Sequence, residues 1–234
     1  MFANLIFYNK SKVEQYKTLI TNKAPQLLSG CVENENQDNN VTCLLECTQF
    51  EELLKDREDF FDFTGSGLDT HVKDIKLNSI IKVKGEIYVP EAFDMIHIIE
   101  QYKPLLIDSM DYQDNDEKRL VESVLCQSKA KIPLFCELGE ECDYWLGIGK
   151  VEQENLFLEY NDLEDLEGQE VTIIAKLEGR KYYKDTPLKV FDIYKDFLGL
   201  NRTLRKQLSN QKTQDFESIT IEEDYLGLEL LAIY

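Results

Sequence analysis

The sequence predicts an α+β fold with a mixed or largely antiparallel sheet, a small barrel-like C-terminal half and packed helices. Strand-like runs crowd residues 132–193 without a helix-length segment between them, which disfavours an alternating, doubly wound α/β fold. Several other segments carry apolar residues at helical spacing. The 234 residues are 43% hydrophobic and 30% charged, a composition that supports a sizeable core.

The chain opens with a strand and a helix. Residues 3–8 are aromatic and apolar, as in a buried strand. Residues 12–21 place their apolar side chains on one helical face, and Asn9 or Ser11 stands where a capping residue is needed. The sequence therefore predicts that a short strand leads directly into an amphipathic helix.

A polar loop, a strand and a second helix are expected next. Residues 33–40 are polar and predict a loop. Residues 41–46 predict a short strand because they are mostly apolar or β-branched. Thr48 has Glu51 three residues later, the spacing of a capping box, so we expect the second helix to begin at Thr48.

The middle of the chain predicts a long strand followed by helices. Residues 79–89 alternate apolar and polar positions over nearly their whole length. Pro90 suits the first turn of a helix, where its missing N–H costs nothing, and the apolar stripe of that helix runs to about Tyr102. Residues 115–127 predict another amphipathic helix, and residues 132–138 a strand.

The last hundred residues are rich in strands. Acidic turns and glycines separate four expected strands, at residues 145–151, 155–160, 170–177 and 188–193. A helix is expected over 195–208, and two closing strands over 216–222 and 226–234. Four strands in under fifty residues should curl into a small barrel or a strongly twisted sheet.

Two related halves are one possible organisation of the chain. Residues 80–87, 145–152 and 172–179 share an apolar run followed by a basic residue and a Gly or Glu. We expect an N-terminal α+β half over 1–112 and a β-rich C-terminal half over 113–234, with one continuous domain as the alternative.

The net charge of −19 restricts the partners of this protein. A surface so acidic repels nucleic-acid backbones and anionic lipid, so we expect neither as a partner. The first residues lack the basic start of a signal peptide, and no apolar run approaches the ~20 residues of a membrane span. We therefore expect a soluble, cytoplasmic protein with reduced cysteines. An acidic mimic of nucleic acid is an alternative interpretation of the charge.

Neither the six cysteines nor the two histidines form a recognisable site. The spacings of Cys43 with Cys47 and of Cys136 with Cys142 differ from those of zinc knuckles, and both Cys43 and Cys136 stand in apolar runs. Cysteine packs as a small hydrophobe, so we favour buried free thiols. We therefore expect no catalytic residues, no metal ligands and no cofactor.

Clusters of carboxylates leave a second functional hypothesis open. They occur at 108–117, 162–167 and 222–224, and such residues serve metal-dependent nucleases and phosphohydrolases. The close pairing of carboxylates with a lysine that those enzymes use is missing, so we interpret the clusters as solvated turns.

One basic group stands out in this acidic chain. Asn201, Arg202, Arg205 and Lys206 lie in the expected 195–208 helix, and the three basic residues share one helical face. Cations favour helix C-termini and also pair with nearby carboxylates. The alternative is that these four residues bind an anion or a partner, for which the planar donor fork of arginine is suited.

Four segments of the chain resemble a known family. They are the aromatic opening strand with Val13 and Tyr16 in its helix, IKVKGEIYVP at 81–90, KDFLGLNRTLRKQL at 195–208 and GLELLAIY at 227–234. The chain resembles an uncharacterised family of bacterial proteins known only as a domain of unknown function. The resemblance implies a cytoplasmic bacterial protein sometimes found near anti-phage genes, and it supplies no catalytic residues.

The function that these observations favour is non-enzymatic binding or regulation in a bacterial cytoplasm. The expected partner is a protein or a small anionic ligand, with Asn201, Arg202, Arg205 and Lys206 as the candidate binding residues. A metal-dependent nuclease or phosphohydrolase and an acidic inhibitor that mimics nucleic acid are the alternatives.

Overall fold

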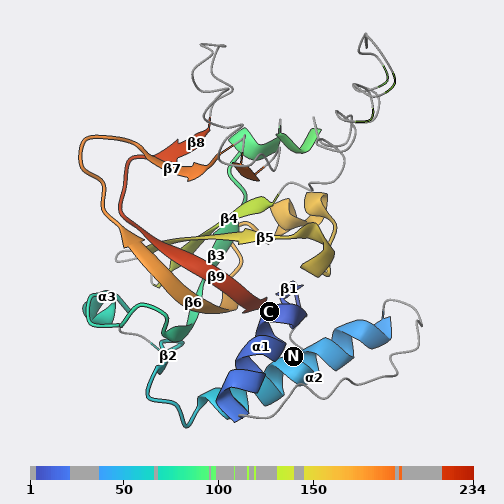
Figure 1. Ribbon diagram of the computed structural model, residues 1–234, viewed down its shortest axis with the longest axis vertical. Helices are drawn as coiled ribbons and strands as arrows, with labels where there is room; N and C mark the ends of the chain where they lie inside the picture. Colours follow the sequence, from blue (N-terminus) through green and yellow to red (C-terminus); the bar gives the residue numbers. More distant parts are fainter. Residues whose placement is uncertain are drawn as a thin grey trace.

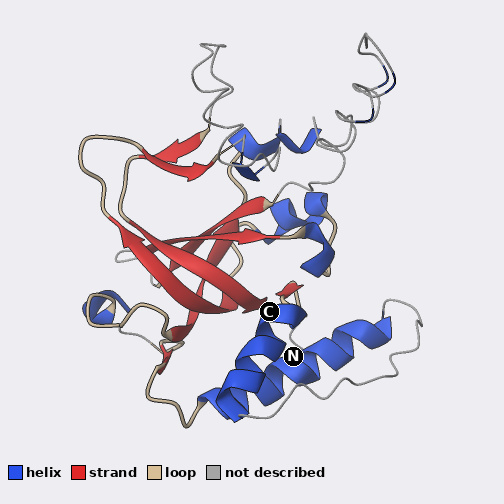
Figure 2. Cartoon of the chain, viewed as in Figure 1, coloured by secondary structure: helices blue, strands red, loops and turns tan. Residues whose placement is uncertain are grey.

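A five-stranded barrel forms the centre of the molecule, and helices pack on its outside (Figures 1 and 2). The computed structural model describes residues 4–21, 37–65, 68–94, 96–98, 131–139, 145–192, 195–196 and 218–234, with the single residues 108, 115 and 119. The predicted α+β fold, including its barrel-like region, is confirmed.

The barrel consists of β3 (Ile80–Tyr88), β4 (Ile132–Leu138), β5 (Trp145–Val151), β6 (Val171–Lys181) and β9 (Tyr225–Ile233). The strands pair in the order β3, β4, β5, β9 and β6, and β6 closes the ring by pairing with β3 as well as β9. All pairs are antiparallel except β5 with β9. This order, with a helix between the third and fourth barrel strands, is the connectivity of the OB fold, a five-stranded Greek-key barrel.

Four short strands extend this framework. β1 (Phe7–Tyr8) runs antiparallel to β9, and β2 (Phe60–Asp62) runs parallel to β3 beyond the point where β4 stops pairing with it. β7 (Leu188–Phe191) and β8 (Ile219–Ile221) form a separate two-stranded sheet in the connection between β6 and β9.

The helices are α1 (Lys10–Thr21), α2 (Gln37–Leu54) and α3 (Leu68–His71), with 3₁₀ helices η1 (Gln153–Asn155) and η2 (Tyr160–Leu166). Asn9 is the residue that caps α1, because its side chain accepts a hydrogen bond of 3.1 Å from the Lys12 amide. None of the helices in the described ranges has the length and apolar content of a membrane span.

Two apolar clusters hold these elements together. The larger one fills the barrel, where Gly147 and Gly149 leave room for the side chains of Leu228 and Leu230. The smaller one lies between the helices and the outer face of the barrel. Its buried members are Leu5, Tyr8, Val13, Cys47, Phe50, Leu54, Ile80, Ile174, Leu231 and Ala232.

The predicted strand at 41–46 is wrong, and so are the predicted helix start at Thr48 and part of the predicted loop over 33–40. A single helix, α2, runs from Gln37 to Leu54. Cys47, Phe50 and Leu54 are its buried residues, and their spacing of three and four puts them on one helical face. Packing of that face against the barrel outweighs the local β-propensity of the apolar run.

The predicted strand at 155–160 is also wrong. Leu156 forms only an isolated bridge with Phe7, and the chain then enters η2 at Tyr160. A reciprocal pair starts this helix, in which the Glu159 amide donates to the Asp162 carboxylate over 3.2 Å. Glu159 and Asp162 have the three-residue spacing of a capping box, but the aromatic run beside them favoured the prediction of a strand.

The barrel strands lie close to their predictions, and β6 departs most. β4 and β5 have the predicted bounds, and β3 and β9 differ from theirs by one residue at each end. β6 (Val171–Lys181) begins one residue after its predicted start and runs four residues past its predicted end. The expected helix at 91–102 is helical at 92–94 and 96–98, the part that the structure describes. The helices expected at 115–127 and 195–208 fall almost wholly outside the described residues. The boundary expected at residue 112 falls between β3 and the other four barrel strands, so both expected halves contribute strands to the barrel.

Candidate functional site

An acidic cavity of about 400 Å³ lies between the end of β3 and η2. Two stretches of chain, separated by more than sixty residues, supply its lining: Val89, Glu91 and Asp94 after β3, and Tyr160, Leu163, Glu164 and Glu167 around η2. Among the residues that the structure describes, the lining thus brings together four carboxylates and no basic side chain.

The chain turns immediately after β3 to place the first wall. Pro90 begins a helical turn, as predicted, in which the Phe93 amide donates to the Pro90 carbonyl over 2.7 Å. The Asp94 amide donates to the Glu91 carbonyl over 3.0 Å. This turn is what brings Glu91 and Asp94 from the strand end to the cavity.

The 3₁₀ geometry of η2 positions the side chains that line the cavity across from Glu91 and Asp94. Residues three apart in a 3₁₀ helix lie one above the other. Tyr160 and Leu163 therefore share a side and are buried, whereas Glu164 and Glu167 share the neighbouring side and reach the cavity. The acidic run at 162–167 was predicted to be a solvated turn. Its four carboxylates are indeed exposed, but residues 160–166 form a 3₁₀ helix.

Tyr160 connects the two walls. Its hydroxyl donates a hydrogen bond of 2.7 Å to Asp94 Oδ1, and the His97 ring stacks on its ring with centres 3.8 Å apart. Burial raises the pKa of Tyr160, and the bond to the Asp94 carboxylate raises it further. The phenol therefore stays protonated, remains a donor and holds Asp94 at the cavity wall.

The lining combines negative charge with apolar surface. Four carboxylates attract positive charge, while Val89 and Leu163 offer apolar contact. Three of these carboxylates, Glu91, Glu164 and Glu167, are exposed to solvent. Within the described ranges, no group of three or more His, Cys, Asp or Glu side chains converges closely enough to hold a metal ion.

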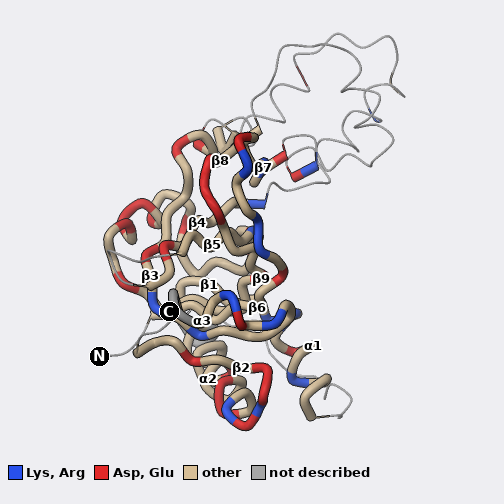
Figure 3. The backbone as a smooth tube through the Cα atoms, turned by 90° about the vertical axis from the view of Figure 1, so that its left-hand side faces the viewer, with Lys and Arg blue, Asp and Glu red and all other residues tan. Residues whose placement is uncertain are grey.

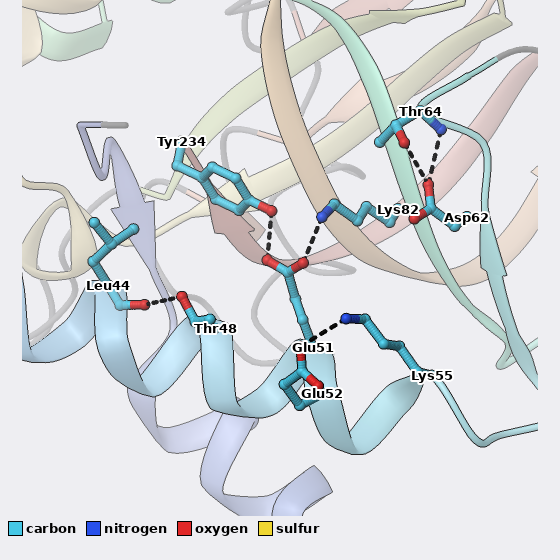
Figure 4. A network of polar contacts seen from close by, with 9 residues as sticks. All are labelled: Leu44, Thr48, Glu51, Glu52, Lys55, Asp62, Thr64, Lys82 and Tyr234. Atoms are coloured by element: carbon cyan, nitrogen blue, oxygen red, sulfur yellow. Dashed lines mark hydrogen bonds and ion pairs between the residues drawn. The ribbon is translucent and has the colours of Figure 1, made fainter. Parts of the chain in front are cut away.

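A second polar cluster attaches α2 to the barrel (Figure 4). Glu51 of α2 accepts hydrogen bonds from Lys82 of β3 and from the Tyr234 hydroxyl, the latter over 2.5 Å. The Lys82 ammonium also lies 5.7 Å from the centre of the Tyr234 ring, within reach of a cation–π contact.

A matching cluster attaches α1. Glu229 of β9 accepts from Lys12 over 2.6 Å, from the Tyr16 hydroxyl over 2.5 Å and from Lys176 over 3.3 Å. Burial alone would raise the pKa of Glu229, but the Lys12 and Tyr16 contacts outweigh burial and lower it. Burial raises the pKa of Tyr16, so its phenol stays protonated. Both clusters therefore join elements and provide no activated nucleophile.

Two of the three thiols that the structure describes, those of Cys47 and Cys136, are unsuited to catalysis. Cys47 and Cys136 are buried, as expected, and burial raises the pKa of each to about 12. Thiolates are the nucleophilic and metal-binding form of cysteine, so both side chains are nearly inert at neutral pH.

The candidate site predicted from the sequence is not tested by the described part of the chain. Asn201, Arg202, Arg205 and Lys206 fall outside the described residues, so their role as binding residues stays a prediction. The sequence reasoning missed the cavity. Its signals were the helix start at Pro90 and the acidic run after Tyr160, but nothing in the sequence shows that these two stretches meet.

Comparison with known proteins identifies one family. The model of a domain of unknown function, DUF6414, matches residues 33–234. No curated protein and no solved structure matches the chain. The resemblance to an uncharacterised domain family is thereby confirmed, whereas its bacterial setting and its link to anti-phage genes stay predictions.

Proposed function

The chain belongs to the DUF6414 family, whose function is unknown, and from that premise we propose that it is a non-enzymatic binding protein for a small organic cation. The observation that carries the proposal is the acidic cavity, with Glu91, Asp94, Glu164 and Glu167 in its lining. A concave site with a few convergent polar groups and a tyrosine of shifted pKa is the usual form of a ligand pocket.

The class of ligand follows from the positions of the four carboxylates. Glu91 and Asp94 stand on one wall, and Glu164 and Glu167 on the other, so a ligand with two or more separated amines can meet both. Its methylene groups would contact Val89 and Leu163. A diamine or polyamine has this chemistry, and it fits a volume of about 400 Å³.

The face that barrels of this connectivity commonly use for binding is not the cavity. By analogy of fold alone, it is the outer face of their second and third strands, which are β4 and β5 here. That face is occupied by the chain itself. Lys150 of β5 pairs with Asp196 over 2.5 Å and lies 5.8 Å from the centre of the Phe191 ring.

The other expectations about function stay predictions. A nucleic acid remains an unexpected partner, because the barrel face that would bind it is covered and the net charge is −19. A protein partner, an anion at Arg202 and Arg205, a cytoplasmic location and a role in phage defence stay predictions. The cavity carboxylates favour a cation at that place instead of an anion.

Calorimetric titration with spermidine and putrescine tests the proposal, with Mg²⁺ as the compact cation for comparison. We expect saturable binding of the amines, a rise in melting temperature and weakening by salt. Glu164→Gln combined with Glu167→Gln should weaken binding at least tenfold, because both side chains line the cavity.

The matched control changes the same net charge away from the cavity. Asp165→Asn combined with Glu178→Gln removes two exposed carboxylates that do not line it. This control should change amine affinity by less than about twofold. Equal losses in both double variants would show that the amines respond only to overall charge, and absence of amine binding to the unmodified chain would reject the cavity as their site.

A further inference from the structure

Residues 4–21, which we call the strand–helix segment, lie outside the part of the chain that the family model matches. That match begins at residue 33, whereas the segment comprises β1 and α1. The barrel ring closes through strands between residues 80 and 233 and needs none of the segment's hydrogen bonds for closure. The ring of strands therefore closes without the segment, although Ile6 and Phe7 of the segment are buried in the main barrel cluster.

The segment adds one strand to an edge of the barrel sheet. Phe7 pairs with Ile233 and Tyr8 with Ala232, and the Ile6 amide donates to the Ile233 carbonyl over 2.8 Å. Addition of a strand to a sheet edge is a common way in which proteins bind peptides. Figure 1 shows α1 continuing from this strand to lie beside α2.

Burial and charge make the segment complementary to its docking surface, which we define as Glu46 and Phe50 of α2 with Glu229, Leu231 and Ala232 of β9. Leu5, Tyr8 and Val13 of the segment are buried in one apolar cluster with Phe50, Leu231 and Ala232.

Basic groups of the segment meet acidic groups of the docking surface. Lys12 pairs with Glu229 over 2.6 Å, and Lys10 pairs with Glu46 over 3.4 Å. The Tyr8 hydroxyl also donates to Glu46 over 3.3 Å. Strand pairing, apolar burial and charge therefore all select this segment.

We propose that the strand–helix segment is an exchangeable ligand, and that the docking surface takes the same segment from a second copy of this chain. Fifteen residues, 22–36, join the segment to α2. Fully extended, they span about 50 Å, enough to reach a neighbouring molecule. Reciprocal exchange produces a two-fold dimer in which every contact of the docking surface is kept.

Exchange competes with the closed monomer. A covalent connection of fifteen residues holds the segment near its own docking surface at an effective concentration on the order of millimolar. Exchange in the unmodified chain therefore requires comparable protein concentrations. A pair of charge-reversed variants removes this obstacle, because the closed form of each is penalised and only the mixed dimer is matched.

The experiment mixes two full-length variants. One carries Lys10→Glu and Lys12→Glu in the segment, and the other carries Glu46→Lys and Glu229→Lys on the docking surface. In each variant alone, like charges face each other at both contacts between the segment and the docking surface. In a reciprocal heterodimer both contacts pair opposite charges again, so native mass spectrometry of the mixture should show a 1:1 complex of twice the 27.3 kDa chain mass.

A charge-matched control separates exchange from general attraction. Glu178→Lys combined with Glu223→Lys changes the net charge equally at exposed positions outside the docking surface, and mixing this variant with the segment variant should leave monomers. Because a lysine at 229 would stand beside Lys176, the single pair Lys10→Glu and Glu46→Lys serves if the double variant does not fold. Folded variants that stay monomeric together, or a control that dimerises equally, would overturn the proposal.

Discussion

Gly85 occupies a point where β3 and β4 approach so closely that no side chain fits. A Cβ there would collide with the Glu137 carbonyl and lie 3.2 Å from Leu138 Cα. We expect Gly85→Ala to lower the free energy of unfolding by about 3 kcal/mol, because backbone atoms of the ring would have to move. Chemical denaturation measures this. Gly179→Ala is the control, since its Cβ would meet nothing within 4 Å, and a similar loss in both variants would refute the steric argument.

Glu229 makes stability depend on pH at the α1 attachment. Its pKa is lowered on folding, so its contribution is present above the ordinary glutamate pKa and is lost as pH falls through the lower folded value. Glu229→Gln should therefore cost about 2 kcal/mol at pH 7 and progressively less below about pH 4.

Urea denaturation at pH 7, 5 and 3 measures the difference between this variant and the unmodified chain. The exposed Glu178→Gln serves as the control and should show little difference at any of the three values. A cost of Glu229→Gln that grows toward acid would contradict the assignment of its partners.

At the scale of elements, Arg180 of β6 ties α3 to the barrel. Its guanidinium donates to the Val72 carbonyl, over 2.6 Å from Nη2, and also to the Ile75 carbonyl. Arg180→Met should speed hydrogen exchange over residues 68–78 by about tenfold or more, because those carbonyls lose charged donors. Exchange in β4 and β5 should change little. Lys181→Met is the control at the neighbouring position. An equal increase in hydrogen exchange in that variant would show that Arg180 does not hold α3 to the barrel.

At the scale of the whole molecule, negative charge is widely spread. Figure 3 shows acidic positions along the barrel, the loops and the helices, and the net charge is −19. Their mutual repulsion opposes the compact state and is screened by salt. Raising NaCl from 0.02 to 0.5 M should therefore raise the melting temperature by a few degrees.

The variant with Glu178→Lys and Glu223→Lys carries less charge and should respond less to the same salt. An uncharged osmolyte at equal osmolality distinguishes screening from general solute effects. A melting temperature that falls with salt would mean that local ion pairs such as Lys82 with Glu51 outweigh the overall repulsion.

The sequence by itself determined the elements whose pattern is local. β4 and β5 were predicted with their observed bounds, and β3 nearly so, because alternation and apolar runs are properties of consecutive residues. The α+β class and the barrel-like region followed from the spacing of these runs. The sequence also offered Asn9 and Ser11 as caps of the first helix, since a cap acts within one helical turn, and the structure selects Asn9.

Only the tertiary structure decided what depends on residues far apart in the chain. The barrel closes only because β6 pairs with both β3 and β9. The helical state of residues 41–46 depends on the barrel face that α2 covers. The acidic cavity exists because Glu91 and Asp94 meet Glu164 and Glu167 across a separation of some seventy residues. Burial and electrostatic attraction act through space, whereas propensity acts along the chain, so the sequence of each turn shows its own local pattern but not that the two turns meet.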